Sequence, residues 1–185
     1  MIFRTILHML RGRRGPRVGI HETGRVRLRV WPTDLDILGH MNNGVYLSIM
    51  DLGRFDLLVR SGVWARFQKL GYYPVVASET ITFRKSLQPW QLYDLESRIV
   101  GYDAKAVYIE QRFVVDGEIF AKGFIRGRFL KRTGGVVSIA ELSEAIGIDV
   151  GDFTPPEWMD EWGAHVALPP TKAPAPNDWA SAPEG

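Results

Sequence analysis

The sequence predicts an α+β domain in which a curved antiparallel sheet wraps one long central helix. Two observations support this fold class. A helical run that is apolar around much of its circumference follows Asn43 and ends near Ser61. Four runs rich in β-branched and aromatic residues come after it, separated by turn residues, which is typical of strands. A helix that is apolar on most sides must be covered, so rolling the strands around it is the economical packing.

The elements follow in order along the chain. Residues 25–30 alternate arginines with apolar side chains, which predicts a half-buried strand that Pro32 ends. The central helix comes next, and a shorter segment leads from it to Pro74. We expect the remaining strands to form an antiparallel meander, with a tight hairpin at Asp116-Gly117. Their expected ranges are 74–86, 90–102, 105–117 and 118–131.

The C-terminal part of the chain has its own helix signals. Ser138 and Glu141 form a capping box that opens a short helix, and Gly147 closes it. Another short helix should start at Pro155-Pro156, with Trp158 and Trp162 docking it onto the domain. The expected organisation is therefore a basic amphipathic arm (1–18), the main domain (19–135), a helical extension (136–167) and a Pro/Ala-rich tail (168–185) whose composition is typical of disorder.

Composition excludes several classes of chemistry. The chain has 185 residues, of which 45% are hydrophobic and 24% charged, as in a globular protein with one good core. It has no cysteine, and its four histidines are too scattered to place two ligands on one helix face. Serine-hydrolase, nucleotide-phosphate and dinucleotide motifs are absent from the sequence. We therefore expect neither a metal nor a bound cofactor to be needed for the chemistry.

The positive charge is concentrated in the N-terminal arm. Five of the 23 Lys and Arg residues precede the first acid, Glu22. From residue 18 onward the chain therefore contains 18 Lys and Arg residues and 21 Asp and Glu residues. This distribution does not indicate a nucleic-acid partner. The apolar run of the arm is too short to span a bilayer, and residues 1–17 fit either packing on the protein or peripheral contact with anionic lipid. We expect a cytoplasmic protein, with the inner membrane surface as the alternative site for the arm.

A polar motif directly precedes the central helix, and it carries a resemblance to a known family. The order strand, D-x-D-x-x-G-H-M-N-N, helix and four strands resembles the hotdog fold, in its 4-hydroxybenzoyl-CoA thioesterase-like branch. The runs WPTDLDILGHMNNGVYLSIMDLGRFDLLVRSG, ASETITFRKSL and PPEWMDEW are similar to the subgroup around thioesterase superfamily member six. Gly39 departs from that subgroup, which tends to have a bulky residue before the histidine. The likeness covers roughly residues 1–165.

The resemblance implies an activity, a substrate and an assembly. Members hydrolyse acyl-CoA thioesters as homodimers or dimers of dimers, with each site formed between two subunits. Coenzyme A is then part of the substrate. The resemblance also implies that Asp36, four residues before His40, is the catalytic carboxylate.

The residues themselves are compatible with this chemistry. Thioester hydrolysis needs a base or nucleophile near the carbonyl carbon and donors for the developing oxyanion. Asn42 or Asn43 is a natural N-cap, and the amides of Asn43, Gly44 and Val45 should point outward at the positive end of the helix dipole. Asp36 is then the base or nucleophile. His40 fits either a structural role or one in polarising the carbonyl.

Other side chains are weaker candidates for catalysis or substrate binding. Asp34 is expected to cap the turn, and Asp51 is the rival carboxylate, although an i,i+3 pair with Arg54 explains it better. Asn42 or Asn43 could also position a water molecule, and Asn42 is a candidate for substrate binding. Three further side chains are candidates for substrate binding: Tyr46 for the acyl pocket, and Arg84 and Lys85 for the phosphates of coenzyme A.

Two other functions remain open at this stage. One is a non-catalytic acyl-CoA or lipid-binding hotdog protein, which would bind acyl-CoA without cleaving it. The other is a dehydratase acting on hydroxyacyl thioesters. The dehydratase reading is weaker, because that chemistry requires a histidine and an acid facing each other across a subunit interface, and His40 alone lies near the site.

Overall fold

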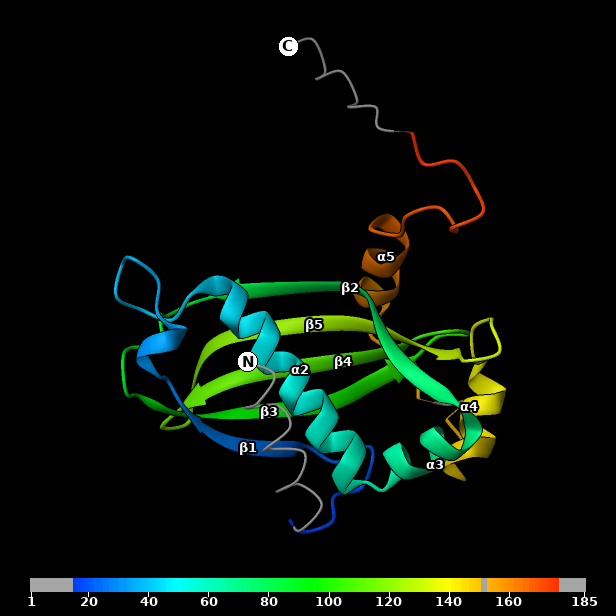
Figure 1. Ribbon diagram of the computed structural model, residues 1–185, viewed down its shortest axis with the longest axis horizontal. Coiled ribbons are helices and arrows are strands. Elements are labelled where there is room, and N and C mark those ends of the chain that lie inside the picture. Colours follow the sequence, from blue (N-terminus) through cyan, green and yellow to red (C-terminus); the bar gives the residue numbers. More distant parts are fainter. Residues whose placement is uncertain (1–14, 151–152, 177–185) are drawn as a thin grey trace.

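A long central helix, α2, lies across the concave face of a five-stranded antiparallel sheet (Figure 1). This computed structural model describes residues 15–150 and 153–176. Most of the N-terminal arm and the last part of the tail therefore lie outside the described residues. The elements are β1 (Gly24–Arg29), the 3-10 helix η1 (Pro32–Asp34), α2 (Asn43–Arg60), α3 (Val63–Leu70), β2 (Tyr72–Phe83), β3 (Leu92–Tyr102), β4 (Val107–Val115), β5 (Glu118–Lys131), α4 (Ile139–Ile146) and α5 (Glu157–His165).

The α+β class and the wrapped helix are confirmed, but the strand order differs from a simple meander. The order across the sheet is β1-β3-β4-β5-β2, so only β3, β4 and β5 follow one another as expected. Strand β1 pairs with the outer edge of β3, and β2 pairs with β5 at the opposite edge. The physical reason is that β1 already occupies the free edge of β3. Residues 84–91 consequently cross the end of the sheet, from the edge strand β2 to β3, which lies next to the opposite edge strand β1 (Figure 1).

The expected alternation and turns are present. In β1 the arginines are exposed while Leu28 is buried, as a half-buried strand requires. Asp116 and Gly117 form the turn between β4 and β5, with φ angles of 48° and 82° that are both positive. This backbone matches the right-handed twist of the two strands.

The two halves of α2 cover different parts of the core. The N-terminal half packs Tyr46, Ile49 and Met50 against the sheet, in one cluster of buried residues. The C-terminal half contributes Leu57 to a second cluster, which also contains side chains from α3, α4 and the end of β3. The core is thus continuous along the helix but has a distinct composition at each end.

The C-terminal helices cover two further surfaces. Helix α4 has the expected capping box, in which Ser138 and Glu141 bond reciprocally, and it ends at Gly147. It lies beside α3 at the end of the sheet opposite the α2 start (Figure 1). Helix α5 packs on the convex face, where Trp158 contacts the ring of Phe124 at 4.7 Å between centroids.

Helix α2 approaches the sheet closely at Gly53. A Cβ atom at this position would lie 2.5 Å from Leu95 Cδ2 and 2.6 Å from Ser97 Oγ. We therefore predict that Gly53→Ala lowers the free energy of unfolding by about 1–3 kcal/mol, because overpacking outweighs the better helix propensity of alanine.

Chemical denaturation followed by circular dichroism measures this effect. The matched control is Gln68→Ala on the exposed side of α3, for which the denaturant concentration at the midpoint of unfolding should stay nearly unchanged. A Gly53→Ala protein as stable as the wild type would show that the helix can move away from the sheet.

Candidate functional site

The residues between Asp36 and His40 form a small closed loop before α2. The Asp36 N–H donates to the His40 carbonyl at 3.0 Å, and the Gly39 N–H donates to the Asp36 carbonyl at 3.1 Å. Gly39 has a φ of +79°, in the left-handed region that favours glycine. This backbone requirement accounts for a small residue before the histidine, and the closed loop brings the acid and the histidine to the same place.

Asp36 and His40 lie side by side. Asp36 Oδ1 accepts a hydrogen bond from the Leu38 N–H at 2.8 Å, while Oδ2 lies 3.4 Å from His40 Nδ1. These last two atoms are near enough to form an ion pair when the imidazole is protonated, but they are not aligned for a hydrogen bond. About a fifth of the Asp36 side chain is exposed, so its second oxygen remains accessible.

Asn42 is the N-cap of α2. Its side-chain oxygen accepts from the Gly44 N–H at 2.8 Å, and its carbonyl accepts from the Val45 N–H at 2.9 Å. Two of the three amides expected to be open are therefore already bonded, because the cap uses them. The Asn43 N–H makes no hydrogen bond to another described residue, and it alone of the three remains a donor at the positive end of the helix.

Asp34 supports the loop from inside. The side chain is buried, and its Oδ2 accepts from the Trp31 N–H at 2.9 Å. Its carbonyl accepts from the Asn42 N–H at 2.8 Å. Asp34 thus joins the turn before the loop to the helix cap after it, which agrees with the structural role expected from the sequence.

Tyr46 ties the start of α2 to the segment that crosses the sheet end. Its hydroxyl accepts from the Leu87 N–H at 3.0 Å, and the Leu87 carbonyl accepts from the Met41 N–H at 2.9 Å. Burial raises the pKa of Tyr46, partly offset by the Leu87 hydrogen bond. The ring packs against Phe83 and Phe113 in the core. Sequence reasoning missed Leu87, because this contact joins residues far apart in the chain.

Two exposed cations lie a few residues before Leu87 in the chain. Arg84 and Lys85 directly follow β2, and both pair with Glu118, at 2.7 and 2.6 Å. Each of the two side chains is about half exposed, so a phosphate could replace the carboxylate as the partner of its charged group. Their role in binding coenzyme A stays a prediction.

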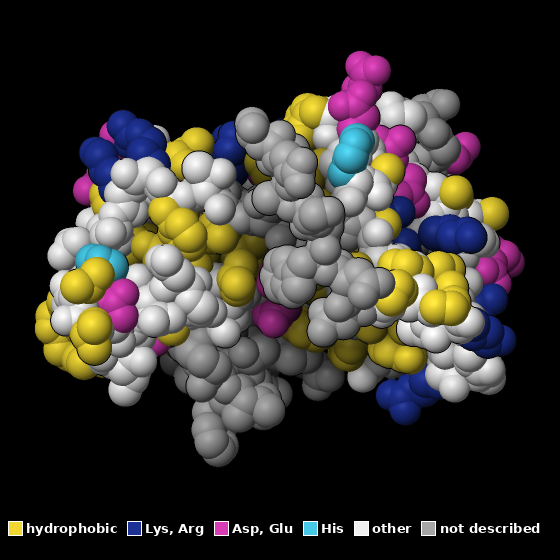
Figure 2. All heavy atoms as spheres, turned by 90° about the horizontal axis from the view of Figure 1, so that it is seen from above, with side chains coloured by type: hydrophobic (Ala, Val, Ile, Leu, Met, Phe, Trp, Pro, Cys, Tyr) yellow, Lys and Arg dark blue, Asp and Glu magenta, His cyan; other side chains and the backbone are white. Residues whose placement is uncertain are grey.

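The same end of the molecule exposes several large apolar side chains. Ile37 and Leu38 are 101% and 74% exposed at the tip of the loop, and the Trp31 and Trp90 rings stand 5.7 Å apart beside it. Figure 2 shows hydrophobic side chains gathered at this end, around a histidine and acidic side chains (left in the view). These residues could not be recognised in the sequence, because isolated apolar residues in a loop form no periodic pattern.

The rival carboxylate, Asp51, lies at the middle of α2. It is eight residues beyond Asn43, which corresponds to about 12 Å along a helix. Asp51 pairs with Arg54, as expected, and the Arg54 guanidinium also donates to Gln111 Oε1 at 2.9 Å and lies 3.8 Å from Glu79. Burial raises the pKa of Glu79, and Arg54 partly opposes that shift. Asp51 and Asp36 therefore do not share one site within a single chain.

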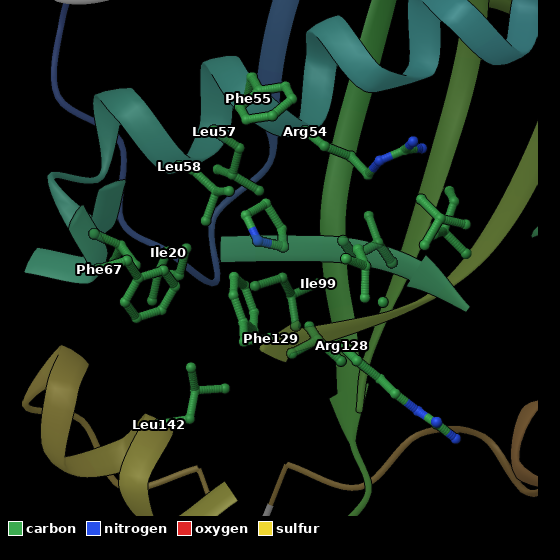
Figure 3. Close-up of a pocket in the computed structure, with 18 of the residues that line it drawn as sticks. Ile20, Arg54, Phe55, Leu57, Leu58, Phe67, Ile99, Arg128, Phe129 and Leu142 are labelled. Carbon is green, nitrogen blue, oxygen red and sulfur yellow. The ribbon is translucent and has the colours of Figure 1, made fainter. Parts of the chain in front are cut away.

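An apolar cavity of about 160 Å³ begins beside Asp51 and Arg54. It extends between α2, α3, β2 and α4, and the side chains that line it include Phe55, Leu58, Phe67, Val75, Phe129 and Leu142 (Figure 3). Tyr46 does not line it. No local sequence pattern indicates this cavity, since its walls come from seven helices and strands and from the segment before β1.

Comparison with known proteins identifies relatives. A model of the thioesterase-like superfamily matches residues 30–179. Protein THEM6 of Xenopus laevis is 40% identical over 99 residues, covering 54% of this chain and 48% of that protein. Protein THEM6 of Danio rerio is 38% identical over 139 residues, covering 75% of this chain and 66% of that protein. The chain thus spans about half to two thirds of these relatives.

Two solved structures with the same fold are named as thioesterases. The YbaW probable thioesterase from Escherichia coli superposes with a TM-score of 0.62 at 21% identity, covering 66% of this chain and 95% of its own. The BH1999 gentisyl-coenzyme A thioesterase superposes with a TM-score of 0.57 at 18% identity, covering 62% and 94%. At such identities the likeness shows the hotdog fold alone.

Two further features of the described residues concern metals and membranes. In residues 15–150 and 153–176, no group of three or more His, Asp or Glu side chains is placed where it could hold a metal ion. None of the described helices is both long and apolar enough to cross a membrane. The expected lipid contact of residues 1–17 falls mainly on residues outside the described part of the chain.

The cap geometry leads to a stability prediction that separates the two asparagines. Asn42→Ala should lower the free energy of unfolding by about 1 kcal/mol, because the Gly44 N–H loses its acceptor. Asn42→Ser should keep most of the wild-type stability, because the serine hydroxyl can accept the same hydrogen bond. Asn43→Ala is the matched control and should change stability little. Denaturant midpoints measure all three variants, and a larger loss for Asn43→Ala would contradict the assignment of the cap.

Proposed function

Since the chain belongs to the thioesterase-like superfamily, we propose that it hydrolyses acyl-CoA thioesters at the start of α2. One observation carries the proposal for the site. The carboxylate of Asp36 lies beside His40, in the loop that leads directly to the open Asn43 N–H at the positive end of the helix. A base and an oxyanion donor are the two groups that thioester hydrolysis requires.

The proposed reaction begins with the thioester carbonyl oxygen accepting from the Asn43 N–H. Asp36 Oδ2 then either takes a proton from an attacking water molecule or attacks the carbonyl carbon itself, forming an anhydride that water cleaves. In both routes the carbon–sulfur bond breaks and the leaving thiolate receives a proton, so that a carboxylic acid and the thiol of coenzyme A are released. His40, 3.4 Å from Asp36, is placed to orient the carboxylate or to polarise the carbonyl.

The other half of the site comes, in this proposal, from a second copy of the chain. Strand β2 is a long edge strand, and more than half of its residues are exposed. The other edge, β1, is only six residues long and carries three exposed arginines, which disfavour pairing. We propose that two β2 strands pair antiparallel about an axis near Ser78 and Glu79, which makes a homodimer.

This pairing would join the two separated halves of the site. Phe83, at one end of β2, contacts Tyr46 at the start of α2, while Pro74 and Val75, near the other end, line the cavity. Antiparallel pairing places the Phe83 end of one copy beside the Pro74 end of the other, with the strands about 4.8 Å apart. The helix start of each copy then lies near the cavity mouth of its partner, and the acyl group can enter that cavity.

Replacement of the proposed base tests the function. Asp36→Asn should lower kcat/KM for acyl-CoA by about 100-fold or more, because the amide cannot accept a proton or form an anhydride. Its side-chain oxygen can still accept from the Leu38 N–H, so the loop should keep its shape. Thiol release with a chromogenic reagent measures the rate, and Asp51→Asn is the matched control.

Two outcomes would contradict this assignment. Full activity in Asp36→Asn together with loss in Asp51→Asn would move the site to the middle of the helix. Acyl-CoA binding by the wild type without cleavage of any chain length would favour the non-catalytic binding protein instead.

Mixed dimers test whether the site is shared between two copies. Leu58→Trp fills the cavity, and Asp36→Asn removes the base, so each homodimer should be nearly inactive. After the two variants are unfolded and refolded together, half of the dimers should be hybrids with one intact site each, restoring about a quarter of the wild-type rate. Absence of any restoration in confirmed hybrids would show that base and cavity must belong to one chain.

A further inference from the structure

We propose that helix α4 closes the inner end of the apolar cavity and thereby limits the acyl group to about six carbon atoms or one aromatic ring. The assignment of the occupant as the acyl group of a thioester rests on the proposed function. The capacity of the cavity to bind an apolar chain of this size is independent of it, and the experiment below separates the two.

The volume of the cavity sets the size of the group that fits. It measures about 160 Å³ and is lined almost entirely by apolar side chains. An engineered cavity of about 150 Å³ lined by Leu, Ile and Phe stays dry and binds benzene. A phenyl group or a chain of about six carbons therefore matches this space, whereas a long fatty acyl chain does not.

The cavity has a polar end and an apolar end. Figure 3 shows the guanidinium groups of Arg54 and Arg128 pointing away from the apolar lining, on the side opposite Phe67 and Ile20. Arg54 is held there by Gln111, which is fully buried. A ligand with one polar end should thus enter beside the arginines and place its apolar end toward Phe67.

Helix α4 supplies the wall that limits this space. Leu142 projects from α4 toward the lining side chains of α2 and β5 (Figure 3), and Ile146 lies one turn further along the same helix face. Both side chains are 5% exposed, so they fill the space between α4 and the rest of the core. Removal of carbon atoms from Leu142 should therefore lengthen the cavity.

The helix that carries this wall is anchored at both of its ends. At its start, Glu141 accepts a hydrogen bond from the N–H of the N-cap Ser138 and pairs with Lys131 of β5 at 2.5 Å. The Lys131 hydrogen bond and the Ser138 contacts lower the pKa of Glu141 to about 2, so the carboxylate is charged at neutral pH. At its end, the Arg66 guanidinium of α3 donates to the Ile146 carbonyl. These contacts hold α4 against α3 and β5, which makes the depth of the cavity a fixed property of the fold.

Binding of uncharged straight-chain alcohols to the wild-type protein tests the size limit without any catalysis. We expect isothermal titration calorimetry with the series from 1-butanol to 1-decanol to show affinity rising about fourfold per carbon up to about six carbons, and no further. Benzyl alcohol should bind as tightly as the six-carbon alcohol. An affinity that rises steadily up to decanol, or no binding of any alcohol, would overturn the proposal.

Substitutions in α4 test the role of its wall. Leu142→Ala removes three carbon atoms, so the chain length of tightest binding should increase by about three, and Leu142→Trp should abolish binding. The matched control is Glu144→Ala, at an exposed position on the same helix. This change should leave the dependence of alcohol affinity on chain length unchanged. Should either Leu142 variant fail to fold, the wild-type series alone still decides the size limit.

The same variants connect the cavity to hydrolysis. If acyl-CoA is cleaved, the chain length with the highest kcat/KM should shift in Leu142→Ala by the same number of carbons as the alcohol series. A different result would be acyl-CoA cleavage that depends on Asp36 while the acyl chain length with the highest kcat/KM stays the same in Leu142→Ala. That result would overturn the role of α4 and leave the proposed function intact. An alcohol limit at six carbons without cleavage of any acyl-CoA would refute the proposed function and leave the cavity assignment standing.

Discussion

The contact between α2 and the sheet at Gly53 determines where everything else in the molecule can lie. Because Gly53 has no side chain, the helix approaches Leu95 and Ser97 closely enough for its own backbone to bond to the sheet. There the Gln111 amide donates to the Met50 carbonyl at 2.9 Å and to Ser97 Oγ at 2.7 Å, while its oxygen accepts from Arg54. These bonds are buried, so breaking them without replacement is costly. They fix the depth and the rotation of α2, and with them the positions of its two ends.

The two ends of α2 divide the chemistry of the protein between them. The start of the helix is polar and tightly hydrogen-bonded, and it holds an acid, a histidine and one open amide. The second half borders an apolar cavity and contributes no open backbone donor, because its amides are bonded within the helix. A thioester has both a reactive polar carbonyl and an apolar chain, so it needs both environments. Within one chain they lie too far apart along α2 to meet at one carbonyl, which is why we propose that the free edge of β2 pairs with a second copy of the chain.

The sequence was informative wherever the relevant signal is local. The start of α2, the Asp116-Gly117 turn and the capping box of α4 all follow from neighbouring residues, and each is confirmed. The strand order could not be read in this way, because whether β2 lies beside β3 or β5 depends on which edge β1 has taken. The cavity was equally inaccessible, since residues from Ile20 to Ile146 build it. The placement of the Asp36 carboxylate beside His40 lies between these cases: their spacing is local, but the distance depends on the positive φ of Gly39.

The surroundings of the two candidate acids explain why they are suited to different tasks. Asp51 and Glu79 stand on either side of Arg54, and Gln111 holds that guanidinium in place. A carboxylate paired with a fixed cation is a poor base, because taking up a proton would break the ion pair. Asp36 keeps one oxygen bonded to the Leu38 N–H, and among the described residues its other oxygen faces the ring of His40 rather than a fixed cation. The cluster around Arg54 is better suited to marking the polar end of the cavity, where a cation balanced by two acids can orient a ligand without taking part in bond cleavage.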